Sequence, residues 1–343
     1  MKGLLCVGVF ALLAAAQQVT GPAPDLPPVL RSLLADEFKF SASDLSELEK
    51  GEVVAHRLGA TAYGEAGAVG AVRIAGRKET FVDLYRDITQ FKRGPVVTSI
   101  GMFGDSPSVR DLASLVVNHR DLNLRECKLN DCDIRLTAGA IKRFQSEVNW
   151  SAPDADERAA LLFKEIFAGY VHDYMSGGSG RITQYDSQKR PIRPADEFSA
   201  LLAGSPYIDR LAPGLARHLE AFPANRLAGA EDFVYWSAEK FGRLAPFVSA
   251  THVTIAQPAA NTYVIVSKNV YSSRYFDASL SLTVAADGVQ PGGFYLVYVN
   301  RSRSSVLKGS FAGMRRAFVE RGARGSVEEN LELTKAKVEN IGR

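Results

Sequence analysis

Side chains able to do acid–base or metal chemistry are few and widely spaced in this sequence. Its five histidines are His56, His119, His172, His218 and His252, and no two of them stand at a spacing typical of metal ligands. Signatures such as G-x-S-x-G and H-E-x-x-H are missing from the sequence. The sequence therefore predicts no metal site and no cofactor, and it favours a non-enzymatic protein while leaving catalysis open.

Two clusters in the C-terminal third combine aromatic and polar residues. His252 lies between apolar positions in SATHVTIA. It is either a polar or acid–base group facing a cavity, or a sheet histidine with satisfied hydrogen bonds. Tyr271 and Tyr275 lie in YSSRYFD, where strand alternation would place them on one face with Ser273 and Asp277. That face would either line a cavity or pack against a neighbouring layer.

Trp236 and Arg301 complete the candidate ligand-binding residues. Trp236 ends the aromatic run FVYW, which indicates either a hinge between a helical block and a sheet or a ligand-stacking position. Arg301 and Arg303 would share one face at a strand end, suited to an anionic headgroup or to a solvated edge. The predicted ligand-binding set is His252, Tyr271, Tyr275, Trp236 and Arg301.

An enzymatic alternative uses His252 or His172 with Asp173 or Asp277 as acid–base partners. The glycine-rich run 177–180 does not predict a phosphate loop. It lacks both a preceding strand and the following Lys-Ser/Thr pair that such a loop requires.

The N-terminus has the three parts of a signal peptide. Lys2 precedes an apolar run over 4–13, and Ala14-Ala15-Ala16 forms a small-residue cleavage site. The run is too short for a permanent anchor, and no later stretch approaches the roughly 20 apolar residues of a spanning helix. We therefore expect residues 1–16 to be a signal peptide, 17–36 to be a leader, and the mature chain to be secreted or periplasmic without a transmembrane segment.

Cysteine usage agrees with export. Loss of the signal peptide removes Cys6 and leaves Cys127 and Cys132, which predict a disulfide in an oxidising compartment. A metal site is the alternative, but it needs two further ligands, and the nearest histidine is His119.

Composition indicates a globular protein with a substantial core. Of 343 residues, 46% are hydrophobic and 23% charged, and the formal net charge is only +3. Basic residues form only short clusters, so the sequence predicts no nucleic-acid partner.

Periodicity divides the chain into two strand-rich parts around a helical block. Strands are expected over 52–58, 67–75 and 96–103, with a helix near 81–88. Helices dominate 108–240, and strands return over 247–256, 262–266, 271–286 and 294–300. The segment 311–338 predicts a long helix or a helix pair broken near Gly322 and Gly325.

The segment GAVRIAGRKETFVDLYRDITQF, residues 70–91, resembles the opening of a START-like (helix-grip, polyketide-cyclase-related) domain. The resemblance implies an α+β fold in which a curved antiparallel sheet wraps a long C-terminal helix. The core would comprise 37–107 and 241–343, interrupted by a helical insert over 108–240.

The same resemblance implies an apolar cavity between sheet and helix that binds a hydrophobic small molecule or lipid. Two alternatives remain open. One is an envelope-associated interaction protein that docks partners through its helical middle. The other is a hydrolase- or isomerase-type enzyme on the same core.

Overall fold

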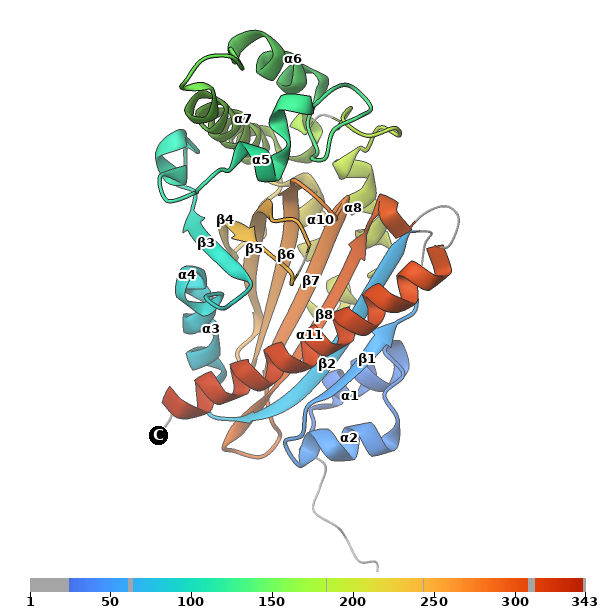
Figure 1. Ribbon diagram of the computed structural model, residues 1–343. Coiled ribbons are helices and arrows are strands. Elements are labelled where there is room, and N and C mark those ends of the chain that lie inside the picture. Colours follow the sequence, from blue (N-terminus) through green and yellow to red (C-terminus); the bar gives the residue numbers. More distant parts are fainter. Residues whose placement is uncertain (1–24, 61–63, 183, 243, 308–311, 342–343) are drawn as a thin grey trace, which may run out of the picture.

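The fold is α+β: an antiparallel sheet, a long C-terminal helix against it, and a helical insert between strands (Figure 1). The computed structural model describes residues 25–60, 64–182, 184–242, 244–307 and 312–341. Of residues 119, 120, 306, 312–318 and 321 only the backbone is described. The expected signal peptide, residues 1–16, and the leader up to residue 24 lie outside the described residues. The predicted fold class and the order of elements are confirmed.

One eight-stranded antiparallel sheet forms the centre, in the order β1-β2-β8-β7-β6-β5-β4-β3. The N-terminal pair β1 and β2 therefore joins the C-terminal strand β8, so the two strand-rich parts make a single sheet. The strands are β1 Val54–Leu58, β2 Glu65–Ala75, β3 Val97–Met102, β4 Glu231–Glu239, β5 Phe247–Ala259, β6 Thr262–Ser272, β7 Ala278–Asp287 and β8 Gly293–Arg303.

Helices cover both faces of this sheet. In chain order they are α1 Pro28–Ser32, the π-helix η1 Leu33–Glu37, α2 Ala42–Glu49, α3 Lys78–Arg86, α4 Ile88–Phe91, η2 Val109–Leu112, α5 His119–Leu122, η3 Leu124–Glu126, α6 Ala138–Glu147, α7 Ala155–Gly177, η4 Gly178–Arg181, α8 Pro194–Ala203, α9 Tyr207–Leu211, α10 Leu215–Ala221, η5 Ser305–Leu307 and α11 Ala312–Ile341.

The C-terminal helix α11 crosses β1 and β2 and reaches α3 at its far end (Figure 1). Among the α11 residues whose side chains are described, Val327, Leu331 and Val338 are apolar and buried, and they join a cluster with α3, α4 and the inner strands. Of the two predicted alternatives, the long helix is confirmed and the break near Gly322 and Gly325 is wrong, because α11 is continuous. Each glycine costs about 1 kcal/mol of helix propensity, and packing of the apolar stripe outweighs that cost.

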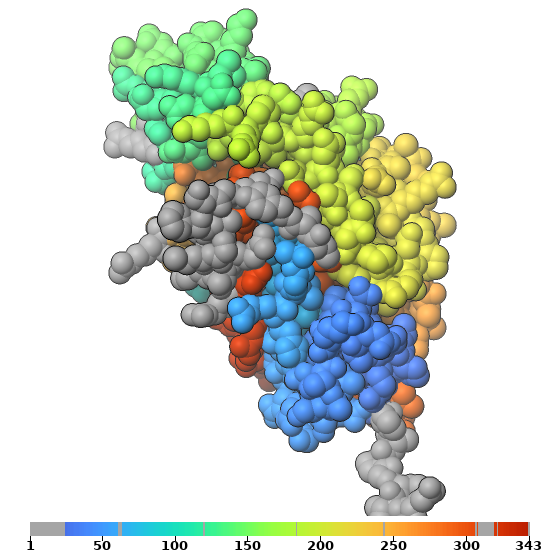
Figure 2. Space-filling model, turned by 90° about the vertical axis from the view of Figure 1, so that its right-hand side faces the viewer, coloured from blue at the N-terminus to red at the C-terminus, as the bar shows by residue number. Residues whose placement is uncertain are grey.

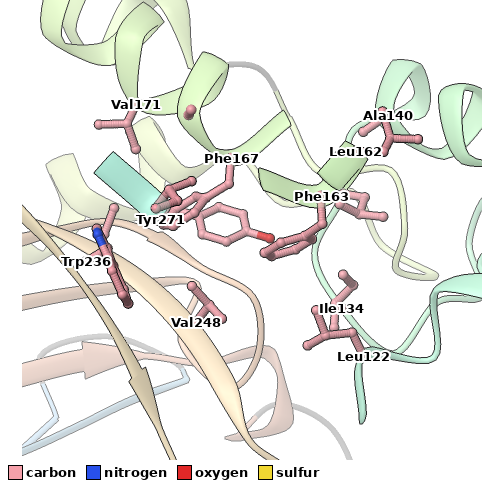
Figure 3. Packing of buried hydrophobic residues seen from close by; sticks show 14 of the residues in the cluster. Leu122, Ile134, Ala140, Leu162, Phe163, Phe167, Val171, Trp236, Val248 and Tyr271 are labelled. Atoms are coloured by element: carbon pink, nitrogen blue, oxygen red, sulfur yellow. The ribbon is translucent and has the colours of Figure 1, made fainter. Parts of the chain in front are cut away.

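The face of the sheet that carries α11, together with α3 and α4, is called here the α11 face; the opposite face is the insert face. On the insert face, Phe163 and Phe167 of α7 pack with Trp236, Val248 and Tyr271 (Figure 3).

The remaining insert-face helices form a second block with the N-terminus. Phe38 contacts Tyr207 edge-on at 5.1 Å between ring centres, and Arg210 forms an ion pair with Glu37. Figure 2 shows the segments 25–50 and 190–230 side by side on this flank of the molecule. Both blocks give the sheet a closely packed backing.

The segment 108–240, expected to be helical, contains a strand. β4 occupies its end, with Val234, Trp236 and Ala238 buried on the insert face and Tyr235 directed to the α11 face. The run FVYW is thus part of the sheet, because its alternate residues serve two different cores. Within the block expected to be helical, the segment 109–117 contains only the short 3-10 helix η2.

The segment Tyr271–Asp277 is not one strand. β6 ends at Ser272, β7 begins at Ala278, and Tyr275 has a φ of 64° in the turn between them. The prediction that Tyr271, Ser273, Tyr275 and Asp277 share a strand face is therefore wrong.

The predicted disulfide is present. Cys127 and Cys132 are bonded at the ends of a short turn closed by a bridge between Lys128 and Asp131. Within the described ranges, no helix combines the length and apolar character needed to cross a bilayer.

Candidate functional site

Neutral polar side chains follow the three central strands β6, β7 and β8 on the α11 face. They alternate with fully buried residues that point to the insert face, and each of them remains half-buried. Because these strands have a neighbour on either side, the exposure is not that of a sheet edge. The members of this polar patch are Ser267, Asn269, Ser279, Ser281, Tyr298, Asn300 and Ser302.

Cross-strand hydrogen bonds organise the patch between β7 and β8. The amide Nδ2 of Asn300 donates to Ser281 Oγ at 2.8 Å. The hydroxyls of Ser281 and Tyr298 are 3.1 Å apart, and those of Ser279 and Ser302 are 2.9 Å apart. A hydroxyl offers one donor and two acceptor positions. These groups therefore retain hydrogen-bonding capacity for a ligand.

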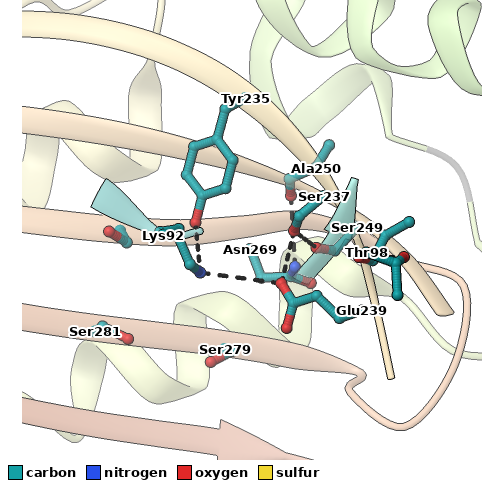
Figure 4. A network of polar contacts seen from close by, with 12 residues as sticks. Lys92, Thr98, Tyr235, Ser237, Glu239, Ser249, Ala250, Asn269, Ser279 and Ser281 are labelled. Carbon is teal, nitrogen blue, oxygen red and sulfur yellow. Dashed lines mark hydrogen bonds and ion pairs between the residues drawn. The ribbon is translucent and has the colours of Figure 1, made fainter. Parts of the chain in front are cut away.

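A charged pair borders the patch on the β4 side (Figure 4). Lys92, which follows α4, donates from Nζ to Tyr235 Oη at 3.1 Å and lies 3.9 Å from Glu239. Ser237 Oγ donates to Glu239 Oε1 at 2.6 Å and lies 3.1 Å from Ser249 Oγ. Burial alone would lower the pKa of Lys92, but Tyr235 and Glu239 outweigh burial and raise it. Lys92 is therefore a stable cation at the border of the patch.

The other half of the α11 face is apolar and covered. Val72, Ile74, Val253 and Ile255 pack there under α3, α4 and α11. Tyr85 of α3 marks the boundary, because its hydroxyl lies 3.0 Å from Ser267 Oγ. The α11 face thus changes along the strands from a covered apolar half to a half-exposed polar half.

A second polar cluster, the His–Asp–His cluster, lies on the insert face. It consists of His218 on α10, Asp232 on β4 and His252 on β5. Both Nε2 atoms lie 2.9 Å from the same oxygen, Asp232 Oδ1, and Thr254 Oγ1 donates to that oxygen at 2.8 Å. Both imidazoles are fully buried, while the Asp232 side chain is 12% exposed.

Hydrogen bonds set the charges in this cluster. Burial alone would raise the pKa of Asp232, but the two histidines and Thr254 outweigh it and hold that pKa far below its ordinary value. Burial lowers the pKa of His252, although Asp232 opposes the change. At neutral pH the cluster therefore combines a carboxylate with a neutral His252.

Lys268 lies beside this cluster, buried on β6. Its Nζ donates to Ser179 Oγ at 2.7 Å and to the Leu219 carbonyl at 2.9 Å. It lies 4.1 Å from the Phe198 ring centre and 5.1 Å from that of Tyr174. Burial lowers the pKa of Lys268 to about 7. The Lys268 side chain thus ties the glycine-rich turn η4 and the end of α10 to the sheet.

The five predicted ligand-binding residues do not meet in one site. His252 belongs to the His–Asp–His cluster. Tyr271 and Trp236 are buried in the core under α7, where Tyr271 Oη donates to the Arg135 carbonyl at 3.0 Å and Trp236 Nε1 to the Asp111 carbonyl at 2.9 Å. Tyr275 Oη donates to the Ala245 carbonyl at 2.8 Å, and Arg301 Nε to Glu65 Oε1 at 2.7 Å.

The proposed acid–base partners are also apart. His252 pairs with Asp232 rather than with Asp173 or Asp277. Asp277 forms an ion pair with Arg135 at 2.5 Å, and His172 lies exposed on α7. His252 therefore contacts a carboxylate that the sequence did not pair with it.

The polar patch itself left a signal in the sequence. Ser279-Leu280-Ser281 and Asn300-Arg301-Ser302 alternate between the two faces. That alternation predicts strands with one polar face, but not which face lies beside α11. Comparison with protein-family models and with curated proteins finds no match to this chain.

Proposed function

We propose that this chain is an exported, START-like binding protein that holds a small molecule with several hydrogen-bonding groups against the polar patch. The observation that carries the proposal is the row of half-buried, neutral polar side chains in the middle of the sheet beside α11. A small-molecule site generally combines an apolar wall with a few placed polar groups. The apolar half of the α11 face supplies the wall, and the polar patch supplies the polar groups.

The polar patch consists of uncharged side chains, namely those of serine, asparagine and tyrosine. Its side chains bond one another across strands, which fixes their directions. Ordered donors and acceptors bind a ligand with less loss of side-chain freedom than mobile ones.

Export is supported by the N-terminal pattern over 1–16 and by the disulfide Cys127–Cys132, since disulfides persist mainly in oxidising compartments. The START-like assignment is supported by the antiparallel sheet with its C-terminal helix packed on it. The hydrophobic or lipid ligand expected from the sequence remains the alternative, supported by the apolar half of the α11 face.

Native mass spectrometry of the intact chain purified from cells tests the proposal. Any retained compound is extracted, identified and titrated back by thermal shift against Ser281→Leu and Asn300→Leu. Each change removes at least one hydrogen bond, and we expect affinity to fall about tenfold per variant. Ser99→Leu is the matched control, because Ser99 is half-buried on β3 on the side opposite Ile100, which packs on the α11 face.

The outcomes separate the two ligand classes. A polar compound whose affinity falls in both patch variants, and not in Ser99→Leu, supports the proposal. An acyl lipid whose binding is the same in all four proteins supports the hydrophobic alternative. A chain that retains nothing and responds to no sugar, polyol or amino acid in a thermal-shift panel contradicts binding at the polar patch.

A further inference from the structure

Three potential metal-donor atoms converge in the His–Asp–His cluster. Asp232 Oδ1 lies 2.9 Å from the Nε2 of His218 and 2.9 Å from the Nε2 of His252, and the three atoms all lie within 4.8 Å of one another. Zinc binds nitrogen and oxygen at about 2.0–2.2 Å. Two donor atoms bound to one zinc ion are therefore about 2.9 Å apart when the donor–metal–donor angle is a right angle, and about 3.4 Å apart when that angle is tetrahedral. The observed separations match an edge of a coordination polyhedron.

The partner of the second ring nitrogen suits metal binding at His252. Its Nδ1 lies 2.7 Å from Tyr174 Oη, which can accept a hydrogen bond. An Nδ1–H that donates to Tyr174 leaves the Nε2 lone pair free for a metal, which is the usual arrangement around metal-bound histidines. His218 Nδ1 lies 3.0 Å from both the Asn225 carbonyl oxygen and the backbone nitrogen of Leu227. Because the Leu227 N–H donates to an unprotonated Nδ1, metal binding through Nε2 of His218 requires the hydrogen bond to Asn225 to replace the one from Leu227.

Regular secondary structure holds the donors in place. Strand pairing sets Asp232 opposite Thr254, and His252 precedes Thr254 on the same face of β5. Thr254 Oγ1 donates to Asp232 Oδ1 at 2.8 Å and orients the carboxylate. β3 pairs with β4 only as far as Tyr235, so Asp232 lies beyond the end of β3. Its 12% exposure gives an ion a path from solvent.

We propose that His218, Asp232 and His252 bind one divalent first-row transition-metal ion, such as Zn²⁺. Two imidazoles and a carboxylate are a donor set for such ions, and three protein ligands leave room for water or a further ligand. The site lies on the insert face, so the proposal is independent of ligand binding at the polar patch. The same atoms can also form a metal-free hydrogen-bonded cluster, with Nε2–H groups donating to Asp232. A measurement of metal binding distinguishes the metal site from this metal-free cluster.

The test uses the full chain without an affinity tag, stripped with a chelator and titrated with Zn²⁺ against a chromophoric competitor. We expect one tight site per chain. His252→Gln should abolish it. Tyr174→Phe keeps all three ligands but removes the partner of His252 Nδ1, and should weaken binding about 10–100-fold. The control is His172→Gln, since His172 is exposed on α7 and should leave affinity unchanged.

Two results overturn the proposal: the absence of a one-to-one site in the wild-type chain, or a site that persists at full affinity in His252→Gln. If His252→Gln does not fold, the wild type and Tyr174→Phe decide the question through Co²⁺. A visible d–d spectrum that saturates at one equivalent, and that is displaced by Zn²⁺, supports the site. A spectrum identical to that of aqueous Co²⁺ refutes it.

Discussion

Gly70 on β2 should control how closely α11 approaches the sheet. A Cβ built at Gly70 lies 2.6 Å from Val327 Cγ1 and 2.7 Å from Leu331 Cδ1. Carbon atoms in contact are ordinarily about 3.5–4.0 Å apart. Gly70→Ala therefore requires α11 to retreat by about 1 Å or its side chains to leave their rotamers.

The expected cost follows from two opposing effects. Overpacking a filled core costs about 1–3 kcal/mol, and replacing glycine within a strand returns about 0.5–1 kcal/mol. We expect Gly70→Ala to lower the free energy of unfolding by roughly 1–2 kcal/mol. Leu331→Ala alone should cost about 2–5 kcal/mol, because it leaves a cavity under α11.

The double variant decides whether the contact is real. In Gly70→Ala with Leu331→Ala the new methyl group occupies space left by the leucine. The combined loss should therefore be smaller than the sum by about 1 kcal/mol. Urea unfolding of all four proteins measures this coupling. Gly94→Ala is the control, because no atom lies within 4 Å of a Cβ at Gly94. Additivity within about 0.3 kcal/mol would refute the close approach of α11 to β2.

Two further predictions concern buried charges. Burial alone would raise the pKa of Asp25, but hydrogen bonds from Gln290 N and Arg73 outweigh it and hold that pKa below 3.8. The stability that Asp25 contributes is thus present above pH 3.8 and lost as pH falls through the lower folded pKa. Asp25→Asn should reduce the fall of Tm that occurs as the pH is lowered below about 3.8. A Tm that falls as steeply as in the wild-type chain would contradict this. Arg301→Met removes one buried partner of Glu65 and should lower the free energy of unfolding in urea by about 3–5 kcal/mol, part of which Glu65→Gln restores. Equal losses in the single and double variants would argue against the pair.

The sequence predicted the order of elements because most strands are rich in β-branched and aromatic residues. Period-two alternation appears over 279–282 of β7 and 298–302 of β8, where one face is polar, and the rest of each strand is mostly buried on both faces. β4 was missed because Val234 and Trp236 face one core and Tyr235 another, so the run FVYW is apolar at every position. Continuous apolar runs do not distinguish a strand buried on both faces from a helix or a hinge.

The His–Asp–His cluster was beyond reach of the sequence. His218, Asp232 and His252 are separated by a helix end, a loop and a strand pair, and no local spacing joins them. Their meeting depends on the register that sets Val234 opposite His252 and on the position of α10 against that strand pair. Register of this kind follows from tertiary packing, which a single sequence does not display.

Tyr271 and Trp236, two of the predicted ligand-binding residues, lie beneath the insert. Their polar atoms donate to backbone carbonyls of that layer. The insert therefore covers the part of the sheet on which these two aromatic residues lie. Ser279 and Ser281 belong to the same strand as the buried Leu280 and Leu282, but point the opposite way. Changes at the serines should thus alter the polar patch while the leucine core stays filled, so the proposed binding and the stability of the fold can vary separately on one strand.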